Sequence, residues 1–279
     1  MARSEDRAAR RGIERPWTRY AIRTLVLGYL FFLLVLPVGL IFWRTFEDGI
    51  QPVIDALTSE SAVHAFQVTL QVAIPAVVLN TVFGVGAAIL LTRHEFRGKR
   101  VFNAFIDLPL AVSPVVVGLA LILVYGRLTP VGGWLSDHGV DVIFALPGMV
   151  AATVFVSLPL VVRAVEPVLE EIGVEQEQAA WTLGANAWQT FRRVTLPAIR
   201  WALAYGVVLA LARCLGEYGA VAVVSGKLVD QTQTVTLFVE ERFQNFDQQA
   251  AFAAASALAL IAVLTLLAIS VLRPKEETR

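Results

Sequence analysis

Six long apolar runs constrain this sequence more than any other feature. Each has about 20 residues or more, and a helix of that length crosses a hydrocarbon core of about 30 Å. They lie near residues 24–43, 66–91, 101–125, 142–163, 198–224 and 250–272. Hydrophobic residues make up 57% of the chain and charged residues only 16%, far from the composition of a soluble domain. The sequence therefore predicts an all-α, polytopic membrane protein with six transmembrane helices.

The first run follows a basic tail, residues 1–23, and so has the outline of a signal peptide. Its apolar stretch is longer than a typical signal core, and no small-x-small cleavage site follows it. We therefore expect a retained first helix.

Lysine and arginine are distributed unevenly between the segments that connect the runs. Eighteen of the 23 lie in the tails 1–23 and 273–279 and the loops 92–100 and 163–200, whereas four lie in the loops on the opposite side. Because basic residues accumulate on the cytoplasmic side, both termini are expected there, together with the polar loop, which we define as residues 164–197. The basic tail is expected to contact membrane lipids, and the balanced net charge gives no indication of a nucleic-acid partner.

Motifs for catalysis or nucleotide hydrolysis are missing from the sequence. A P-loop needs Gly-Lys followed by Ser or Thr, and neither Gly-Lys pair, at Gly98 and Gly226, has that neighbour. The chain has no Gly-x-Ser-x-Gly elbow and no His-Glu-x-x-His helix. Its three histidines lack metal-ligand spacing. The sequence therefore predicts a non-enzyme with no metal site and no cofactor.

Charged residues are rare within the runs, so each one is informative. Asp107 lies about 9 Å along its helix at 1.5 Å per residue, where it either lines a water-filled path or finds a local donor. Arg213 and Glu217 lie four residues apart near the middle of their run. Such residues normally face protein or water and are often paired. They form either a structural ion pair or a pair that also biases the potential along a route for anions.

The polar loop separates two of the most apolar runs. Helical spacing predicts two short helices joined at Gly184, with Trp188, Phe191 and Val194 on one side of the second. Amphipathic helices that lie on lipid headgroups are usually basic on their polar face, whereas this loop has five glutamates between residues 166 and 177. A cytoplasmic protein partner therefore fits the loop better than a lipid surface.

The polar loop resembles the EAA loop of ABC-importer permeases, whose pattern is Glu-Ala-Ala-x3-Gly-x9-Ile-x-Leu-Pro. Two positions depart from it, because Gln178 replaces the glutamate and Val194 replaces the isoleucine. The adjacent Glu177 is an alternative for the role of the missing glutamate. The matching residues are Gln178, Ala179, Ala180, Gly184, Val194, Leu196 and Pro197.

Other stretches look like the sulfate/thiosulfate permease subunits of the CysW type. They are "DLPLAVSPVVVGL" from Asp107, "PVGGWL" from Pro130 and "GEYGAVAVVSG" from Gly216. The stretch "TQTVTLFVEERF" departs from the family, which usually has a Leu-Pro-Leu run there. The resemblance covers residues 66–272 and implies the type I ABC importer permease (MetI-like) fold in the bacterial cytoplasmic (inner) membrane.

The resemblance also implies partners. They are a second permease subunit in a heterodimer, two cytoplasmic ABC ATPase subunits and an extracytoplasmic sulfate-binding protein. The matched loop residues, with Glu177, would couple to the ATPase, and the pathway candidates would be Arg213, Glu217, Ser113 and Asp107. The implied substrate is sulfate or thiosulfate; molybdate or tungstate is the alternative. A membrane scaffold or enzyme that recruits an unrelated cytoplasmic partner is the alternative of a different class.

Overall fold

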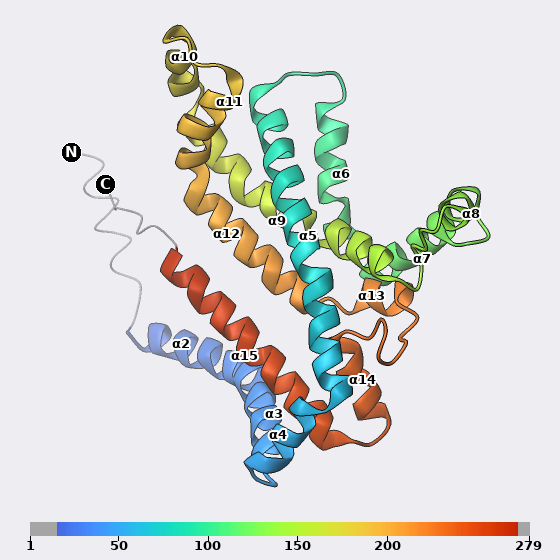
Figure 1. The fold of residues 1–279 in the computed structure, drawn as a ribbon. Helices are drawn as coiled ribbons and strands as arrows, with labels where there is room; N and C mark the ends of the chain where they lie inside the picture. The colour runs from blue at the N-terminus through green and yellow to red at the C-terminus, as the bar shows by residue number, and fades with distance from the viewer. Residues whose placement is uncertain (1–15, 273–279) are drawn as a thin grey trace.

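The computed structural model describes residues 16–272, and this part of the chain folds into helices and their connections, with no strand (Figure 1). The predicted tail 273–279 lies outside the described residues, as does most of the tail 1–23. In chain order the helices are α2 (Pro16–Leu30), the π-helical turn η1 (Phe31–Val35), α3 (Leu36–Phe46), α4 (Ile50–Thr58), α5 (Glu60–Arg93), α6 (Lys99–Ala111), α7 (Pro114–Tyr125), α8 (Pro130–Asp137), α9 (Leu146–Ile172), α10 (Glu175–Thr182), α11 (Ala187–Thr190), the π-helical turn η2 (Phe191–Thr195), α12 (Leu196–Leu215), α13 (Gly219–Val224), α14 (Val235–Gln244) and α15 (Gln248–Leu272).

Five continuous helical segments among residues 16–272 are long and apolar enough to cross a membrane. A sixth is counted only if α6 and α7, which bend by 114° at their junction, form one span. The five are Tyr20–Phe46, Glu60–Arg93, Leu146–Ile172, Ala187–Leu215 and Gln248–Thr265.

Three of the predicted segments differ in detail from the helices. The run 101–125 is not straight, because it breaks between α6 and α7. The run 198–224 ends its first helix at Leu215 and resumes as α13 at Gly219. The polar loop begins inside α9, which continues to Ile172. Apolar composition alone does not register these changes of direction.

The core of the bundle is formed by α5 and α9, with α12 against both (Figure 1). Close helix packing is possible because Gly84 of α5 and Gly206 of α12 have no side chain. A Cβ added to Gly84 would lie only 2.8 Å from Val161 of α9, and one added to Gly206 only 2.9 Å from Ala164 of the same helix. Small residues permit such approach between membrane helices.

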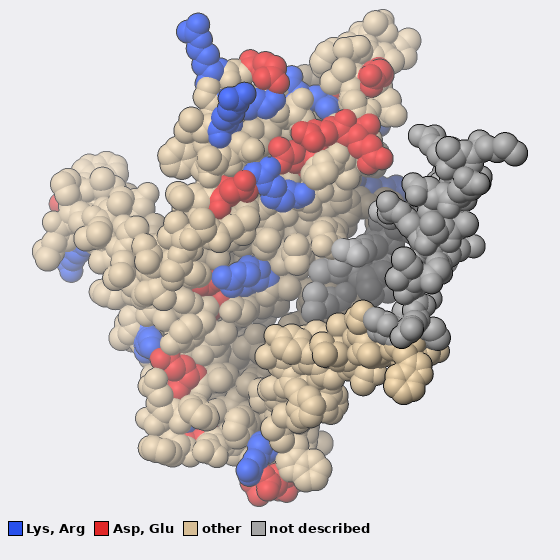
Figure 2. All heavy atoms as spheres, turned by 180° about the vertical axis from the view of Figure 1, so that it is seen from behind, with Lys and Arg blue, Asp and Glu red and all other residues tan. Residues whose placement is uncertain are grey.

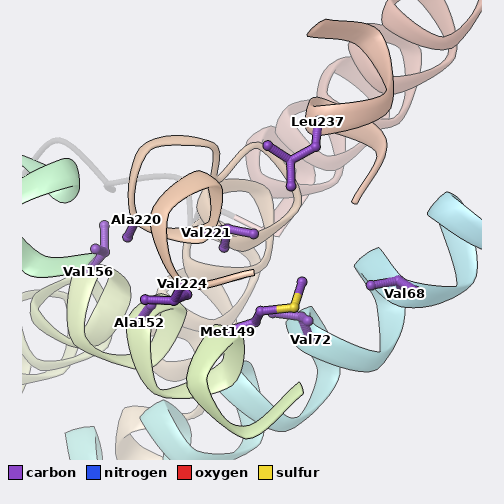
Figure 3. Packing of buried hydrophobic residues seen from close by; sticks show 9 residues of the cluster. All are labelled: Val68, Val72, Met149, Ala152, Val156, Ala220, Val221, Val224 and Leu237. Carbon is purple, nitrogen blue, oxygen red and sulfur yellow. The ribbon is translucent and has the colours of Figure 1, made fainter. Parts of the chain in front are cut away.

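Buried apolar side chains form clusters along this core. Figure 3 shows the cluster in which Val72 of α5 and Met149 of α9 meet residues of α13 and Leu237 of α14. A second cluster lies nearer the end that carries α10, where Leu91, Leu169 and Ile199 are fully or almost fully buried. The end of the bundle that carries the polar loop therefore has an apolar core of its own.

The first helical segment lies at the side of the bundle. The apolar window of Tyr20–Phe46 contains no buried residue. Thr45 of α3 is buried and anchors this segment to α15, because its hydroxyl lies 2.7 Å from that of Ser256 and donates to the carbonyl of Phe252 at 3.0 Å.

Charged side chains gather at one end of the molecule. Figure 2 shows Lys, Arg, Asp and Glu concentrated at the end that carries α10 and α11 in Figure 1, with few charged groups across the tan surface below. The charged groups that do occur at the level of the spans therefore need partners or water.

Candidate functional site

Two helices are interrupted within the predicted runs. Between α6 and α7 the backbone is extended at Val112 and Ser113, and Pro114 begins α7. Between α12 and α13 the chain leaves the helix at Gly216. Irregular backbone at membrane depth is tolerated where it is buried in protein or lines a water-filled cavity. These two interruptions are therefore candidates for the lining of a path through the membrane.

The two interruptions lie against each other. A Cβ added to Gly219, the first residue of α13, would lie 3.0 Å from the Cβ of Pro114. A Cβ added to Gly118 of α7 would lie 2.7 Å from the Cβ of Val223. The approach requires glycine on both helices, and it brings the predicted pathway candidates Ser113 and Glu217 into one region.

Arg213 and Glu217 form an ion pair at this place, with 2.7 Å between Nη1 and Oε2. The Glu217 side chain is 2% exposed and that of Arg213 is 38% exposed. The other carboxylate oxygen accepts from the backbone N–H of Ala220 at 2.9 Å, and Thr236 donates to the Glu217 carbonyl at 2.9 Å. The carboxylate is thus fixed inside the protein, whereas the guanidinium reaches its surface.

Asp107 belongs to a separate cluster on α6 and α9. Arg163 Nε donates to Asp107 Oδ1 at 2.8 Å, and Nη2 donates to Oδ2 of the same carboxylate. Arg163 also donates to Asn103 at 2.7 Å and to Glu166. The counting of basic residues assigned Arg163 to a loop, whereas it lies inside α9. Its partner is 56 residues away in sequence, so helical spacing gave no signal for the pair.

In the polar loop, Gly184 lies between two short helices, as the spacing predicted. Its φ of +85° is in the left-handed region that favours glycine. The N–H of Gly184 and that of Ala185 donate back to carbonyls of α10, at 2.9 and 3.0 Å. Asn186 then begins α11 with a reciprocal cap, in which its side chain and that of Gln189 each accept a backbone N–H at 2.9 Å. The turn between the helices is therefore fixed by local hydrogen bonds.

The neighbours Glu177 and Gln178 differ in their exposure to solvent. Glu177 is 8% exposed and binds Arg93, whereas Gln178 is exposed, as is Ala179. Ala180 is half-buried. Large apolar side chains extend the outward surface, because Trp181, Leu183 and Trp188 are 55%, 88% and 67% exposed.

The end of the motif joins the loop to α12. Val194 is half-buried in η2, and Leu196 packs against the cluster that contains Ile199. Pro197 is exposed and lies at the start of α12, directly after the π-helical turn η2 and inside the continuous helical segment Ala187–Leu215. These three residues therefore shape the junction between loop and bundle.

A family model agrees with this architecture. The model for "Binding-protein-dependent transport system inner membrane component" matches residues 80–277, more than half of the chain. The chain belongs to this family. The resemblance found from the residue motifs is therefore confirmed at the level of the family.

Relatives of this inner membrane component carry permease names. The chain is 49% identical to the sulfate transport system permease protein CysW of Synechocystis sp., covering 89% of this chain and 90% of that protein. It is 44% identical to CysW of Escherichia coli (strain K12), over 89% and 85% of the two chains. Identity to CysT of the same Escherichia coli strain is 37%, over 90% and 92%.

Solved structures show the same fold as this inner membrane component. A chain of a bacterial alginate ABC transporter, crystallised with an alginate pentasaccharide-bound periplasmic protein, gives a TM-score of 0.75 at 19% identity, covering 93% of this chain and 94% of that one. A second crystal structure of a bacterial ABC transporter involved in alginate import gives 0.74 at 17% identity. The expected all-α, MetI-like importer permease fold is confirmed.

Sequence reasoning missed several polar residues of this inner membrane component. Arg93 and Thr195 both bind Glu177, and Arg163 binds both Asp107 and Asn103. Each contact joins residues at least 18 positions apart. A charged residue within an apolar run was the available signal for Asp107, but nothing local identified its partner.

Proposed function

We propose that this chain is the membrane-spanning permease subunit of an ATP-driven importer for sulfate or thiosulfate. The observation that carries the proposal is identity of 44–49% to three curated relatives named CysW, over nearly the whole length of both chains. Identity to CysT is lower, at 37%. The CysW role therefore fits better than the CysT role, and a second permease of the CysT kind fits as the heterodimer partner.

The polar loop supports coupling to a separate ATPase. Its outward surface combines Gln178 and Ala179 with the exposed side chains of Trp181, Leu183 and Trp188. Buried aromatic residues contribute much of the energy of protein interfaces, so exposed tryptophans beside a fixed turn suit a docking surface. The chain has no P-loop of its own. The energy for transport would come from two ATPase subunits that bind this loop in the cytoplasm.

The abutting helix interruptions support a route beside α7, α12 and α13. Ser113 and the partly exposed guanidinium of Arg213 would face an oxyanion, and Glu217 would hold that guanidinium in place. Asp107 lies in the Arg163 cluster, so its part in the pathway would be indirect. In this proposal residues 24–272 form the transmembrane domain, both termini are cytoplasmic, and an extracytoplasmic binding protein delivers the anion.

A reconstituted complex tests the proposal. The tagged chain, expressed with its candidate partners, should co-purify with an ABC ATPase and a second permease. In vesicles it should take up labelled sulfate when ATP and the binding protein are supplied. Thiosulfate should compete strongly, and molybdate weakly.

Three results would contradict this proposal in different ways. Strong competition by molybdate at the level of uptake would point to another oxyanion. Uptake that continues without ATP would exclude ATP-driven import. Purification with an unrelated cytoplasmic protein and no ATPase would favour a membrane scaffold.

A further inference from the structure

We propose that Glu177 is a positioning residue that fastens α10 of the polar loop to the ends of α5 and α9 through Arg93, and to η2 through Thr195. The inference rests on the proposed coupling function and adds a specific mechanical role. In it, Gln178 and its exposed neighbours contact the ATPase, while Glu177 transmits the displacement of the loop into the bundle.

The contacts of Glu177 come from two directions. Arg93, at the end of α5, donates from Nε to Oε2 at 2.9 Å and from Nη2 to Oε1 at 3.3 Å. Thr195, in η2, donates from its hydroxyl to Oε1 at 2.8 Å. A two-pronged arginine contact fixes orientation as well as distance. Both oxygens of the carboxylate are therefore held.

Arg93 carries the connection one step further. Its Nη1 donates to the backbone carbonyl of Leu169 at 2.9 Å. Leu169 is fully buried in the cluster that also contains Leu91 and Ile199. One guanidinium therefore ties α10 to α5 and to α9, in a region where side-chain packing leaves little freedom.

Burial makes this contact different from the surface ion pairs of the chain. The side chains of Arg93 and Glu177 are 9% and 11% exposed. Exposed ion pairs contribute little because water screens them, whereas removal of one partner from a buried pair leaves an uncompensated charge. Separating Arg93 from Glu177 therefore costs more than separating an exposed pair.

The helix that carries Glu177 is short and mostly exposed. α10 has eight residues, and Glu177 is its buried residue. Gly173 before the helix and Gly184 after it both have positive φ values, of +64° and +85°. Besides the backbone hydrogen bonds of the turn that follows it, this short helix is connected to α5 by the contact between Glu177 and Arg93. Networks of hydrogen bonds and ion pairs are one means by which coupling is carried between distant sites.

The test compares Glu177→Gln with Glu175→Gln in the complete reconstituted complex. Glutamine at position 177 keeps an acceptor for Thr195 but removes the charge that Arg93 binds. Glu175 provides a matched control because it lies exposed on the same helix. We expect both variants to co-purify with the ATPase and to hydrolyse ATP, while Glu177→Gln alone lowers substrate taken up per ATP hydrolysed by at least about fivefold.

A covalent link that restores uptake per ATP would distinguish a loss of positioning from a folding defect. Arg93→Cys with Glu177→Cys should lose coupling, and a short bis-maleimide that bridges the two thiols should restore uptake per ATP. The one native cysteine, Cys214, is 5% exposed and should not compete for the reagent. A folding defect would not be repaired by a link added after assembly.

The outcomes distinguish this inference from the function on which it rests. Unchanged uptake per ATP in Glu177→Gln would overturn the positioning role, as would failure of the bridged cysteine pair to recover coupling. Loss of ATPase binding in Glu177→Gln alone would also overturn it, in favour of direct contact. If the unmodified chain binds no ATPase, the proposed function itself fails.

Discussion

Glu217 is a single residue whose contacts fit both a structural role and a role in the transport pathway. Its carboxylate begins α13 through the N–H of Ala220 and pairs with Arg213, which extends to the protein surface. The sequence alone is compatible with a structural role and with a pathway role. The geometry fits both, because the buried carboxylate orients a guanidinium that is 38% exposed.

Neutralising these residues singly and together should separate the two roles. Arg213→Gln leaves the buried Glu217 without its counter-ion, so we expect destabilisation of up to about 3 kcal/mol. The double variant Arg213→Gln with Glu217→Gln removes both charges, and its thermal stability should recover. If the guanidinium serves the anion route, sulfate uptake by the double variant should stay low at normal expression.

Arg44→Gln provides the matched control, because Arg44 pairs with Glu47 at the surface and both side chains are well exposed. Its stability and uptake should be close to those of the unmodified chain. Recovery of uptake in the double variant to this level would leave Arg213 with a structural role alone.

At the scale of elements, α7 and α13 approach each other closely at Gly118, which has no side chain. A Cβ on Gly118 would meet Val223 at 2.7 Å and the carbonyl of Ala220 at 2.9 Å. We expect Gly118→Ala to destabilise the protein by about 1–3 kcal/mol through overpacking. Thermal unfolding in detergent would measure the loss.

The control for this change is Gly86→Ala on α5, where an added Cβ would meet nothing within 4 Å. Alanine is the better helix former, so this variant should match or exceed the stability of the unmodified chain. Equal melting temperatures for the two variants would mean that α7 and α13 separate at little cost.

The helices were predictable where a long apolar run stays straight, because hydropathy measures length and composition. It does not measure direction, so the bend at Ser113 and the break at Gly216 are not visible in hydropathy, and the local signals there are Pro114 and Gly216. The register of the polar loop was predictable from spacing, and Gly184 occupies the expected turn. The inward orientation of Glu177 was not, since it depends on Arg93, 84 residues earlier.

At the scale of the whole molecule, one hydrogen bond restricts the path of the chain. Arg93 at the end of α5 binds Leu169 near the end of α9, so these two ends lie on the same side. α9 is long enough to span. The chain between α5 and the start of α9 must therefore pass to the opposite side, and α6 with α7 is the apolar segment available for it.

Cysteine labelling from each side of the membrane should detect this crossing. Arg97 and His138 are both exposed, before α6 and after α8. A membrane-impermeant maleimide should label Arg97→Cys from one side and His138→Cys from the other. Labelling of both from the same side would instead make α6 and α7 a re-entrant hairpin, which returns to its starting side.

The pairing of Arg213 with Glu217 also has an electrical consequence. Two opposite charges that move together carry no net charge through the membrane field, whereas each unpaired unit charge works against about 2.3 kcal/mol per 100 mV. A divalent oxyanion entering a negatively charged interior would meet about twice that amount across the full field. The voltage dependence of the proposed import would then come from the cargo, while this pair stays electrically silent.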